Sequence, residues 1–398
     1  MESYLMHSDI DKLLAGIFSS EDSPSLRELF EQRIIQLNIT KSQAYDALEM
    51  DKKSVEPILD NEAKQVDTIK LLKIGEFLNL DVEKTIQLYL NQNTAEKTRE
   101  LNRTRKAKFI FENFDLTGLK KLGFISDIKN LAEIEDRIVS FFGLKDIFEY
   151  RDETLNRVAF SKSKISASDK LRAFWIRTAY AQFETINNPN EFDRDRLKQL
   201  ISRIKPYSRN EKDGFFTVCK ALYHAGVTVI FQRHIPQTQV RGATFVVNNK
   251  PCIIITDLFK RYGTIWFSLL HELFHALYHL DDIKTRSFHL TGEADLWLDN
   301  EEEADDFARR YFLPDERYKF IVPSISNHFV VQKYAKEWDI HHCLIYNFYC
   351  YDNPEYWPGY NKYDPGLDES VQKINAIPFN KETVSEIVLE IKNNLELV

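Results

Sequence analysis

The chain has 398 residues, is 43% hydrophobic and carries a formal net charge of -8 at pH 7. A chain of this length exceeds one ordinary hydrophobic core, so two or three domains are expected. The acidic balance argues against a protein that coats nucleic acid, although it leaves room for one small basic patch.

The sequence also argues against a membrane protein and against a secreted one. The sequence has no run near the roughly 18 apolar residues of a membrane span. Its beginning, MESYLMHSDIDKLL, lacks the basic start and apolar core of a signal peptide. The four cysteines have no C-x-x-C spacing and are expected to be free thiols. Together these features predict a cytoplasmic protein.

Apolar residues before residue 91 recur at helical spacing, which predicts four or five short helices. Thr40 is a suitable N-cap for a helix that ends at Leu48, and Asp51 for a helix over residues 52–59. Two short helices joined by a tight turn form the helix-turn-helix plan, whose second helix lies in the major groove of DNA. Residues 25–90 resemble the Cro/repressor-type (XRE) family. The resemblance makes four residues candidate DNA contacts: Lys41, Lys52, Lys53 and Ser54.

This segment also departs from the Cro/repressor-type pattern. Tyr45 stands where the family has a small Ala, Glu49 where it has a turn Gly, and Lys41 where it often has Gln. Pro57 lies inside the expected recognition helix and removes a backbone donor there. Residues 1–90 carry ten Lys and Arg against seventeen Asp and Glu, a net charge of -7, which disfavours phosphate contacts. A DNA-binding module and a degenerate helical module for protein contacts therefore both stay open.

The rest of the chain predicts an α+β, mostly helical protein. Residues 91–108 form the clearest basic run, which fits either a solvated linker helix or contact with a DNA backbone. Beyond Pro206 we expect a helix ended by Gly226, then short strands over residues 227–231, 243–247 and 252–256. The expected domains are a helix-turn-helix-like domain (1–92), a basic linker helix (93–130), a helical region with a mixed core at 206–350 (131–350) and a tail (351–398).

The segment HELFHALYH, residues 271–279, places titratable groups inside an apolar helical run. An H-E-x-x-H pattern puts His271 and His275 one turn apart on one helix face, where both imidazoles can bind one metal ion. Glu272 then lies near a metal-bound water as a candidate base. His279 continues the spacing but lies on the wrong turn for the same metal, which favours a structural or cleft-rim role. The alternative is a buried helix whose polar groups are satisfied by neighbours, which is costly without a metal.

A catalytic zinc site usually has three protein ligands, so a third ligand should follow the histidine pair. The segment NEEEADDFA predicts an acidic helix in which Glu301 and Asp305 share one face. Glu301 is the candidate third ligand and Asp305 the candidate hydrogen-bond partner of a ligand imidazole. Glu303 is the rival ligand. The ligand types favour zinc over iron or manganese.

The H-E-x-x-H pattern is typical of zinc metallopeptidases, and two further expectations follow from that chemistry. A tetrahedral intermediate needs a donor for its oxyanion, and the candidates are His341, His342, Tyr311 and Arg241. For the two histidines, a packed helix start is the competing interpretation. An extended peptide substrate would pair with an edge strand, for which we take residues 252–256.

The motifs TIWFSLLHELFHALYH and EEEADDFARRYFLP resemble the ImmA/IrrE group of zinc metallopeptidases, with similarity from about Leu171 to Tyr346. Together with the N-terminal segment, the arrangement resembles the regulator and HigA-type antitoxin members that fuse both modules. The resemblance implies His271, His275 and Glu301 as metal ligands and Glu272 as the base of a gluzincin-like peptidase.

The expected function is zinc-dependent cleavage of a specific repressor-like protein in a stress, phage or toxin-antitoxin response. The alternative is a DNA-binding regulator or antitoxin, bound to a partner toxin, in which the zinc fold is a sensor or scaffold. Residues 382–397 predict an amphipathic helix for either partner contact or self-packing. A dimer is compatible with either function.

Overall fold

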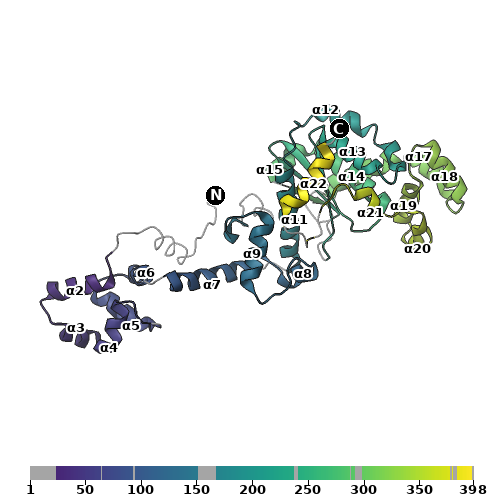
Figure 1. Ribbon diagram of the computed structural model, residues 1–398. Coiled ribbons are helices and arrows are strands. Elements are labelled where there is room, and N and C mark those ends of the chain that lie inside the picture. The colour runs from purple at the N-terminus through teal and green to yellow at the C-terminus, as the bar shows by residue number, and fades with distance from the viewer. Residues whose placement is uncertain are drawn as a thin grey trace. The chain divides into compact units, whose positions relative to one another are not determined.

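The computed structural model describes residues 24–63, 65–92, 95–150, 167–236, 241–286, 288–291, 298–376, 379 and 383–396. The chain divides into two compact units, Met1–Lys108 and Phe109–Val398 (Figure 1). Helices account for most of the described residues and surround one small sheet, which confirms the α+β, mostly helical class. Among the described residues, no helix is both long enough and apolar enough to cross a membrane.

The first unit is a small helical module. Its helices are α2 (Leu26–Leu37), α3 (Lys41–Leu48), α4 (Lys52–Leu59), α5 (Thr68–Phe77) and α6 (Val82–Gln92). Thr40 and Asp51 cap α3 and α4 as predicted, each accepting a hydrogen bond from a backbone N–H in the first turn. Leu26, Phe30 and Val55 are fully buried in the core of this unit. Helix α7 (Ala95–Asn113) continues across the boundary between the units.

Two departures from the Cro/repressor-type pattern have visible consequences. Glu49 ends α3 with a φ of 52°, the left-handed conformation that a turn glycine adopts without strain. Its carboxylate accepts a hydrogen bond from Lys73 at 2.8 Å. The Tyr45 hydroxyl donates to Glu56 on α4, so this larger side chain ties the two helices together.

The second unit begins with helices and then builds a sheet. Before the sheet come α8 (Leu116–Lys121), α9 (Leu131–Phe142), η1 (Ile147–Tyr150), α11 (Ala167–Ile186), α12 (Arg194–Ile201), η2 (Lys205–Arg209) and α13 (Gly214–Tyr223). The strands are β1 (Thr228–Gln232), β2 (Gly242–Val247), β3 (Lys250–Ile255), β4 (Phe288–Thr291) and β5 (Asn375–Ala376). Between β3 and β4 lie α14 (Tyr262–Tyr278) and α15 (Leu280–Arg286).

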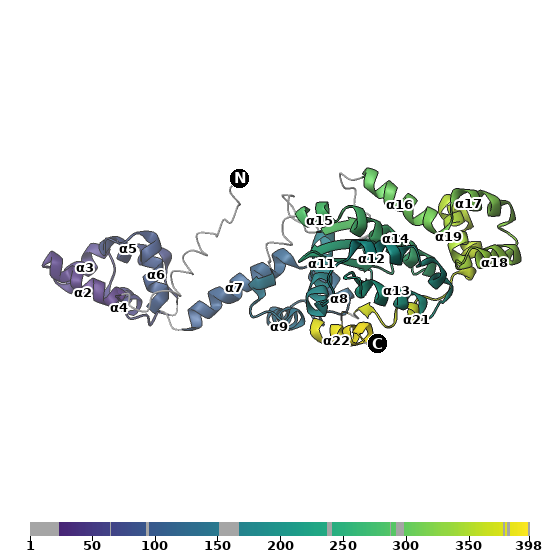
Figure 2. The same cartoon turned by 90° about the horizontal axis from the view of Figure 1, so that it is seen from above.

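Helices also follow the sheet-forming region. They are α16 (Leu298–Phe312), α17 (Asp315–Ile321), η3 (Val322–Ser324), α18 (His328–Glu337), α19 (His342–Asp352), η4 (Pro354–Tyr356), α20 (Trp357–Tyr360), η5 (Asn361–Tyr363), α21 (Asp368–Val371) and α22 (Val384–Glu396). Figure 2 shows α14 and α16 in the second unit, with α17, α18 and α19 following. Helix α14 packs against β2, β3 and α16.

The sheet is mixed, with strand order β4-β2-β3-β1-β5. Strands β2 and β3 form an antiparallel hairpin whose turn residues, Asn248 and Asn249, have positive φ angles, as expected for a tight hairpin turn. Strand β1 runs parallel to β3 and to β5. Every residue of β1 is buried, so both faces of the sheet are covered there.

The expectation that residues 252–256 form an edge strand was wrong. Strand β3 pairs with β2 on one side and with β1 on the other, so its main-chain groups are already used within the sheet. The edge strands are β4 and β5, which the sequence analysis did not predict. A peptide cannot add to β3 without displacing a neighbouring strand.

The C-terminal helix packs on its own unit. Helix α22 contacts α11 and α13, and its apolar face, which includes Val388, Ile391 and Leu395, is buried. Of the two roles left open for the predicted helix over residues 382–397, the structure supports self-packing; residues 382 and 397 lie outside the described part.

A residue far along the chain caps the start of α14. The preceding residue, Arg261, provides no side-chain cap. Instead the Asp364 carboxylate accepts a hydrogen bond from the Tyr262 backbone N–H at 2.6 Å and another from the Asn347 side chain at 3.0 Å. Burial raises the pKa of this carboxyl group. The segment after α19 therefore fixes the beginning of α14.

Gly226, at the turn between α13 and β1, provides a test of the fold. Its φ is +81°, and a Cβ there would lie 2.5 Å from the backbone of Glu191. Gly143 also has a positive φ, +66°, but its Cβ would meet nothing within 4 Å. We expect Gly226→Ala to lower the free energy of unfolding by about 3 kcal/mol and Gly143→Ala by about 1 kcal/mol, measured by chemical denaturation. Equal losses would contradict the close packing at Gly226.

Candidate metal centre

Helix α14 carries three titratable side chains into the interior. His271, Glu272 and His275 are 2%, 0% and 2% exposed. The helix forms here because its other residues are predominantly apolar and pack on β2, β3 and α16. Burial of three such groups requires nearby partners of opposite charge or hydrogen-bonding character.

Glu301 on α16 completes a group of three possible metal ligands with His271 and His275. The two Nε2 atoms lie 3.2 Å apart. One Glu301 oxygen is 3.2 Å from His275 Nε2, and the other is 3.5 Å from His271 Nε2. Among the described residues, this is the one group of His, Cys, Asp and Glu that meets such a criterion.

These separations match the requirements of a small tetrahedral ion. Ligands bound to zinc at about 2.0–2.1 Å and at tetrahedral angles are about 3.4 Å from one another. The three observed distances, from 3.2 to 3.5 Å, fall around that value. Two imidazole nitrogens and one carboxylate are also a donor set that zinc accepts. The residues present therefore fit a metal ion.

Electrostatics at His271 favour a positive charge in the cluster. Its Nδ1 lies 2.8 Å from Asp305, while its Nε2 faces Glu301. Burial disfavours the imidazolium, but the hydrogen bonds to Asp305 and Glu301 outweigh it and raise the pKa of His271 to about 10. The same carboxylates would stabilise a metal cation in place of the proton.

His279 contacts a candidate ligand, although it is not itself one of the three. Its Nδ1 lies 3.0 Å from Nδ1 of His275. When Nε2 of His275 faces a metal, its Nδ1 carries the hydrogen and can donate to His279. His279 thus orients one candidate ligand as Asp305 orients the other. Sequence spacing correctly kept His279 out of the ligand set but did not reveal this contact.

Glu272 is held by β2, on the side of α14 that faces the sheet. The Thr244 hydroxyl donates to Glu272 Oε2 at 2.6 Å. A Cβ at Gly242 would lie 2.4 Å from Glu272 Oε1, so only glycine leaves room for the carboxylate. Gly242 and Thr244 share a strand face because they are two residues apart. Sequence analysis missed both, since nothing local in β2 indicates which helix residue it meets.

Two of the four oxyanion candidates, Tyr311 and His341, have hydrogen-bond partners that are not metal ligands. The Tyr311 hydroxyl donates to the Ile201 carbonyl and accepts from the Lys205 N–H. His341 caps α19 and contacts Glu211 through Nε2 at 2.9 Å. Burial, with His341 and His328 nearby, lowers the pKa of His342 to about 4. The structure supports the packed helix-start role for the histidine pair, since His341 caps α19 and His342 lies beside it, and it adds no support for Tyr311, His341 or His342 as oxyanion donors.

Arg241 is the oxyanion candidate that reaches the centre. It lines a narrow pocket together with Gly242, His271, Glu272 and Asp305. Phe259, Phe267, Thr264, Ser268 and Tyr351 also line this pocket, and the sequence analysis did not predict them as site residues. The pocket gives a ligand access to the region beside the candidate metal ligands.

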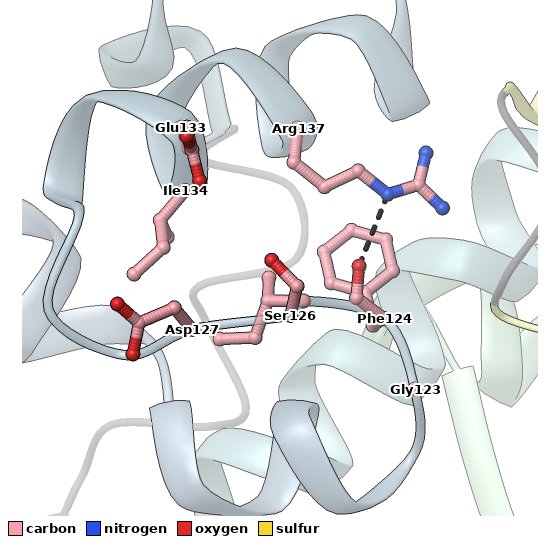
Figure 3. A pocket seen from close by; sticks show the side chains of 8 residues that line it. Gly123, Phe124, Ser126, Asp127, Glu133, Ile134 and Arg137 are labelled. Carbon is pink, nitrogen blue, oxygen red and sulfur yellow. Dashed lines mark hydrogen bonds between the residues drawn. The ribbon is translucent and has the colours of Figure 1, made fainter.

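A second hollow lies between the loop that follows α8, residues 123–127, and the first half of α9 (Figure 3). Its lining includes the Asp127 and Glu133 carboxylates and the Arg137 side chain. The Arg137 guanidinium donates to the carbonyls of Phe124 and Phe379, both at 3.1 Å, and lies over the Phe124 ring. Arg137 therefore has a structural role here, and the hollow contributes nothing to the metal centre.

The candidate DNA contacts in the first unit differ in their surroundings. Lys52 and Lys53 are exposed at the start of α4, whereas Lys41 forms an ion pair with Glu31. Ser54 accepts a hydrogen bond from Lys70 at 3.3 Å. Nearby, Arg27 donates hydrogen bonds to Glu56 on α4 and to Asp60, the residue that follows α4. These carboxylates neutralise a cation that could otherwise bind a DNA phosphate.

Comparison with protein-family models, curated proteins and solved structures finds no match to this chain. The resemblance to ImmA/IrrE peptidases and to Cro/repressor-type domains therefore stays a prediction.

Zinc affinity of variants can decide between Glu301 and the exposed Glu303 as the third metal ligand. We expect Glu301→Gln to lower the zinc affinity of the metal-free protein by at least a hundredfold, because a charged ligand is lost, and Glu303→Gln to leave it unchanged. Asp305→Asn should lower it by about 10–100-fold through the lost partner of His271. Competition titration with a chromophoric chelator measures all three. If Glu303→Gln alone lowered the zinc affinity, Glu303 and not Glu301 would be the third ligand.

Proposed function

We propose that the protein is a zinc-dependent endopeptidase that cleaves a specific repressor-like regulatory protein. The observation that carries this proposal is the fixed position of Glu272. A site that only stored or sensed a metal would need His271, His275 and Glu301, but it would not need a buried carboxylate beside them. Here Thr244 and Gly242 hold that carboxylate in place.

Zinc bound at this centre would polarise a peptide carbonyl and make an adjacent water a stronger acid. Glu272 would accept the proton of that water and return it to the leaving amine. The Thr244 hydroxyl binds one carboxylate oxygen, so it orients the other toward the pocket that Glu272 lines. Arg241 lines the same pocket and is the remaining candidate to stabilise the oxyanion.

Specificity for a particular protein has two sources of support. The pocket beside the metal ligands is narrow and has aromatic walls, which restricts the side chains that enter it. The resemblance to ImmA/IrrE peptidases, some of which carry a helix-turn-helix module, suggests a transcriptional regulator as the substrate. The first unit would then recognise either DNA near the regulator or the regulator itself.

Substitution of Glu272 tests catalysis separately from metal binding. We expect Glu272→Gln to keep one zinc per chain but to lower cleavage at least a hundredfold, because the proton acceptor is lost. Thr244→Val should retain zinc and lower cleavage about tenfold, since the carboxylate loses its fixed partner. Glu303→Gln is the matched control and should cleave as the wild type does.

The substrate for this experiment comes from co-expression of each variant with repressor-like proteins encoded near its gene, with fragments identified by mass spectrometry. Zinc is measured on the same preparations. Cleavage by Glu272→Gln at the wild-type rate would reject Glu272 as the base. If zinc is bound stoichiometrically and no neighbouring regulator is cut by the wild type, the regulator or antitoxin function replaces the peptidase.

DNA binding is a second function supported by one observation, the exposure of Lys52 and Lys53 at the start of α4. If this helix enters the major groove, the double variant Lys52→Glu/Lys53→Glu should bind promoter DNA at least tenfold more weakly. Lys120→Glu/Lys121→Glu, in the second unit, is the control. Gel shifts at graded salt provide the measurement. Absence of any sequence-specific complex with the wild type would leave the first unit as a protein-contact module.

A further inference from the structure

The pocket beside the metal ligands is built by three separate parts of the chain. Thr264, Phe267 and Ser268 project from the first half of α14, Phe259 from the loop before it and Tyr351 from the end of α19. His271 and Glu272 border the same pocket. A peptide placed for attack beside Glu272 would therefore direct an adjacent side chain into it.

The walls of this pocket are aromatic. Phe267 and Tyr351 lie with their ring centroids 6.2 Å apart, and Phe267 also lies 6.3 Å from the His271 ring. Phe259 contributes another aromatic side chain and lies under the guanidinium of Arg241, 5.7 Å from its carbon. The pocket that these rings line is narrow.

Two uncharged polar residues of α14 also line the pocket. Thr264 and Ser268 are each 8% exposed. Thr264 Oγ1 is buried and makes no hydrogen bond within the strict distance and angle limits among the described residues, although a looser hydrogen bond to the Tyr351 phenol lowers the pKa of that phenol. Burial has the larger, opposite effect and raises the pKa of Tyr351, so the phenol keeps its proton. A buried hydroxyl with unused hydrogen-bonding capacity costs stability unless a ligand completes it.

We propose that this pocket binds the substrate side chain next to the scissile bond and selects small, hydrogen-bonding residues such as Ser, Thr or Asn. This inference rests on the proposed peptidase function. The polar tip of the side chain would bond to Thr264, while Phe267 and Tyr351 pack on its carbon atoms. A bulky side chain is disfavoured because the pocket lined by Phe267 and Tyr351 is narrow.

Binding of hydroxamates tests the pocket without requiring catalysis. The probes are succinyl hydroxamates that chelate the metal and differ only in the side chain at position 2: hydrogen, hydroxymethyl, carboxamidomethyl, isobutyl or benzyl. Affinity for the zinc-loaded, full-length protein is measured by calorimetry. We expect the hydroxymethyl and carboxamidomethyl compounds to bind about tenfold tighter than the unsubstituted one, and the benzyl compound to gain nothing.

Two variants assign the preference to particular residues. Thr264→Val should remove the tenfold preference for the polar side chains, because its shape is kept and its hydroxyl is lost. Tyr351→Ala should allow the benzyl compound to bind about tenfold tighter than it binds the wild type. Thr217→Val is the matched control, since that hydroxyl donates to Asp213 on an exposed part of α13 and should affect no compound.

The outcomes separate this inference from the proposed function. Equal affinity for all side chains, with the unsubstituted hydroxamate bound, overturns the pocket assignment and leaves the peptidase standing. A preference for isobutyl or benzyl in the wild type also overturns it. If the unsubstituted compound does not bind the zinc-loaded protein, the metal centre is inaccessible and both proposals fail. Should Thr264→Val not fold, Tyr351→Ala alone decides, because an unchanged benzyl affinity rejects the pocket.

Discussion

The burial of three titratable side chains on one helix is the constraint on which the rest of the second unit depends. Helix α14 removes His271, Glu272 and His275 from water, so each needs a partner from another part of the chain. Strand β2 supplies one for Glu272, α16 supplies carboxylates for both histidines, and the end of α14 itself supplies His279. These side-chain contacts hold the sheet and α16 in place against α14.

The parts of the centre that the sequence predicted are those set by helix geometry alone. Residues four apart on a helix lie on the same face wherever the helix packs, so His271 pairs with His275, and Glu301 with Asp305. The helix with Glu301 follows the histidine helix at a distance along the chain that suggested that the two helices meet. Cap signals are similarly local, and Thr40 and Asp51 make the predicted contacts.

What the sequence did not predict depends on packing between distant segments. Thr244 meets Glu272 because β2 crosses behind α14, and the pairing of strands decides that crossing. The prediction that β3 is an edge strand was wrong, and its sequence pattern explains why. Cys252 to Ile255 are apolar without alternation, which is typical of a strand covered on both faces, whereas an edge strand more often alternates. Tyr351 lies some 80 residues beyond the helix that it meets, and no local pattern marks it.

The capping of α14 by Asp364 and the packing of α22 on α11 determine the order in which the protein can be assembled during synthesis. The first unit is complete once its helices have left the ribosome, and it can fold while the rest is being translated. The metal centre cannot be completed at that stage, because the helix that carries it gains its N-terminal cap from a residue more than a hundred positions after its start. The candidate metal ligands would therefore reach their final arrangement late in synthesis, after the first unit has folded.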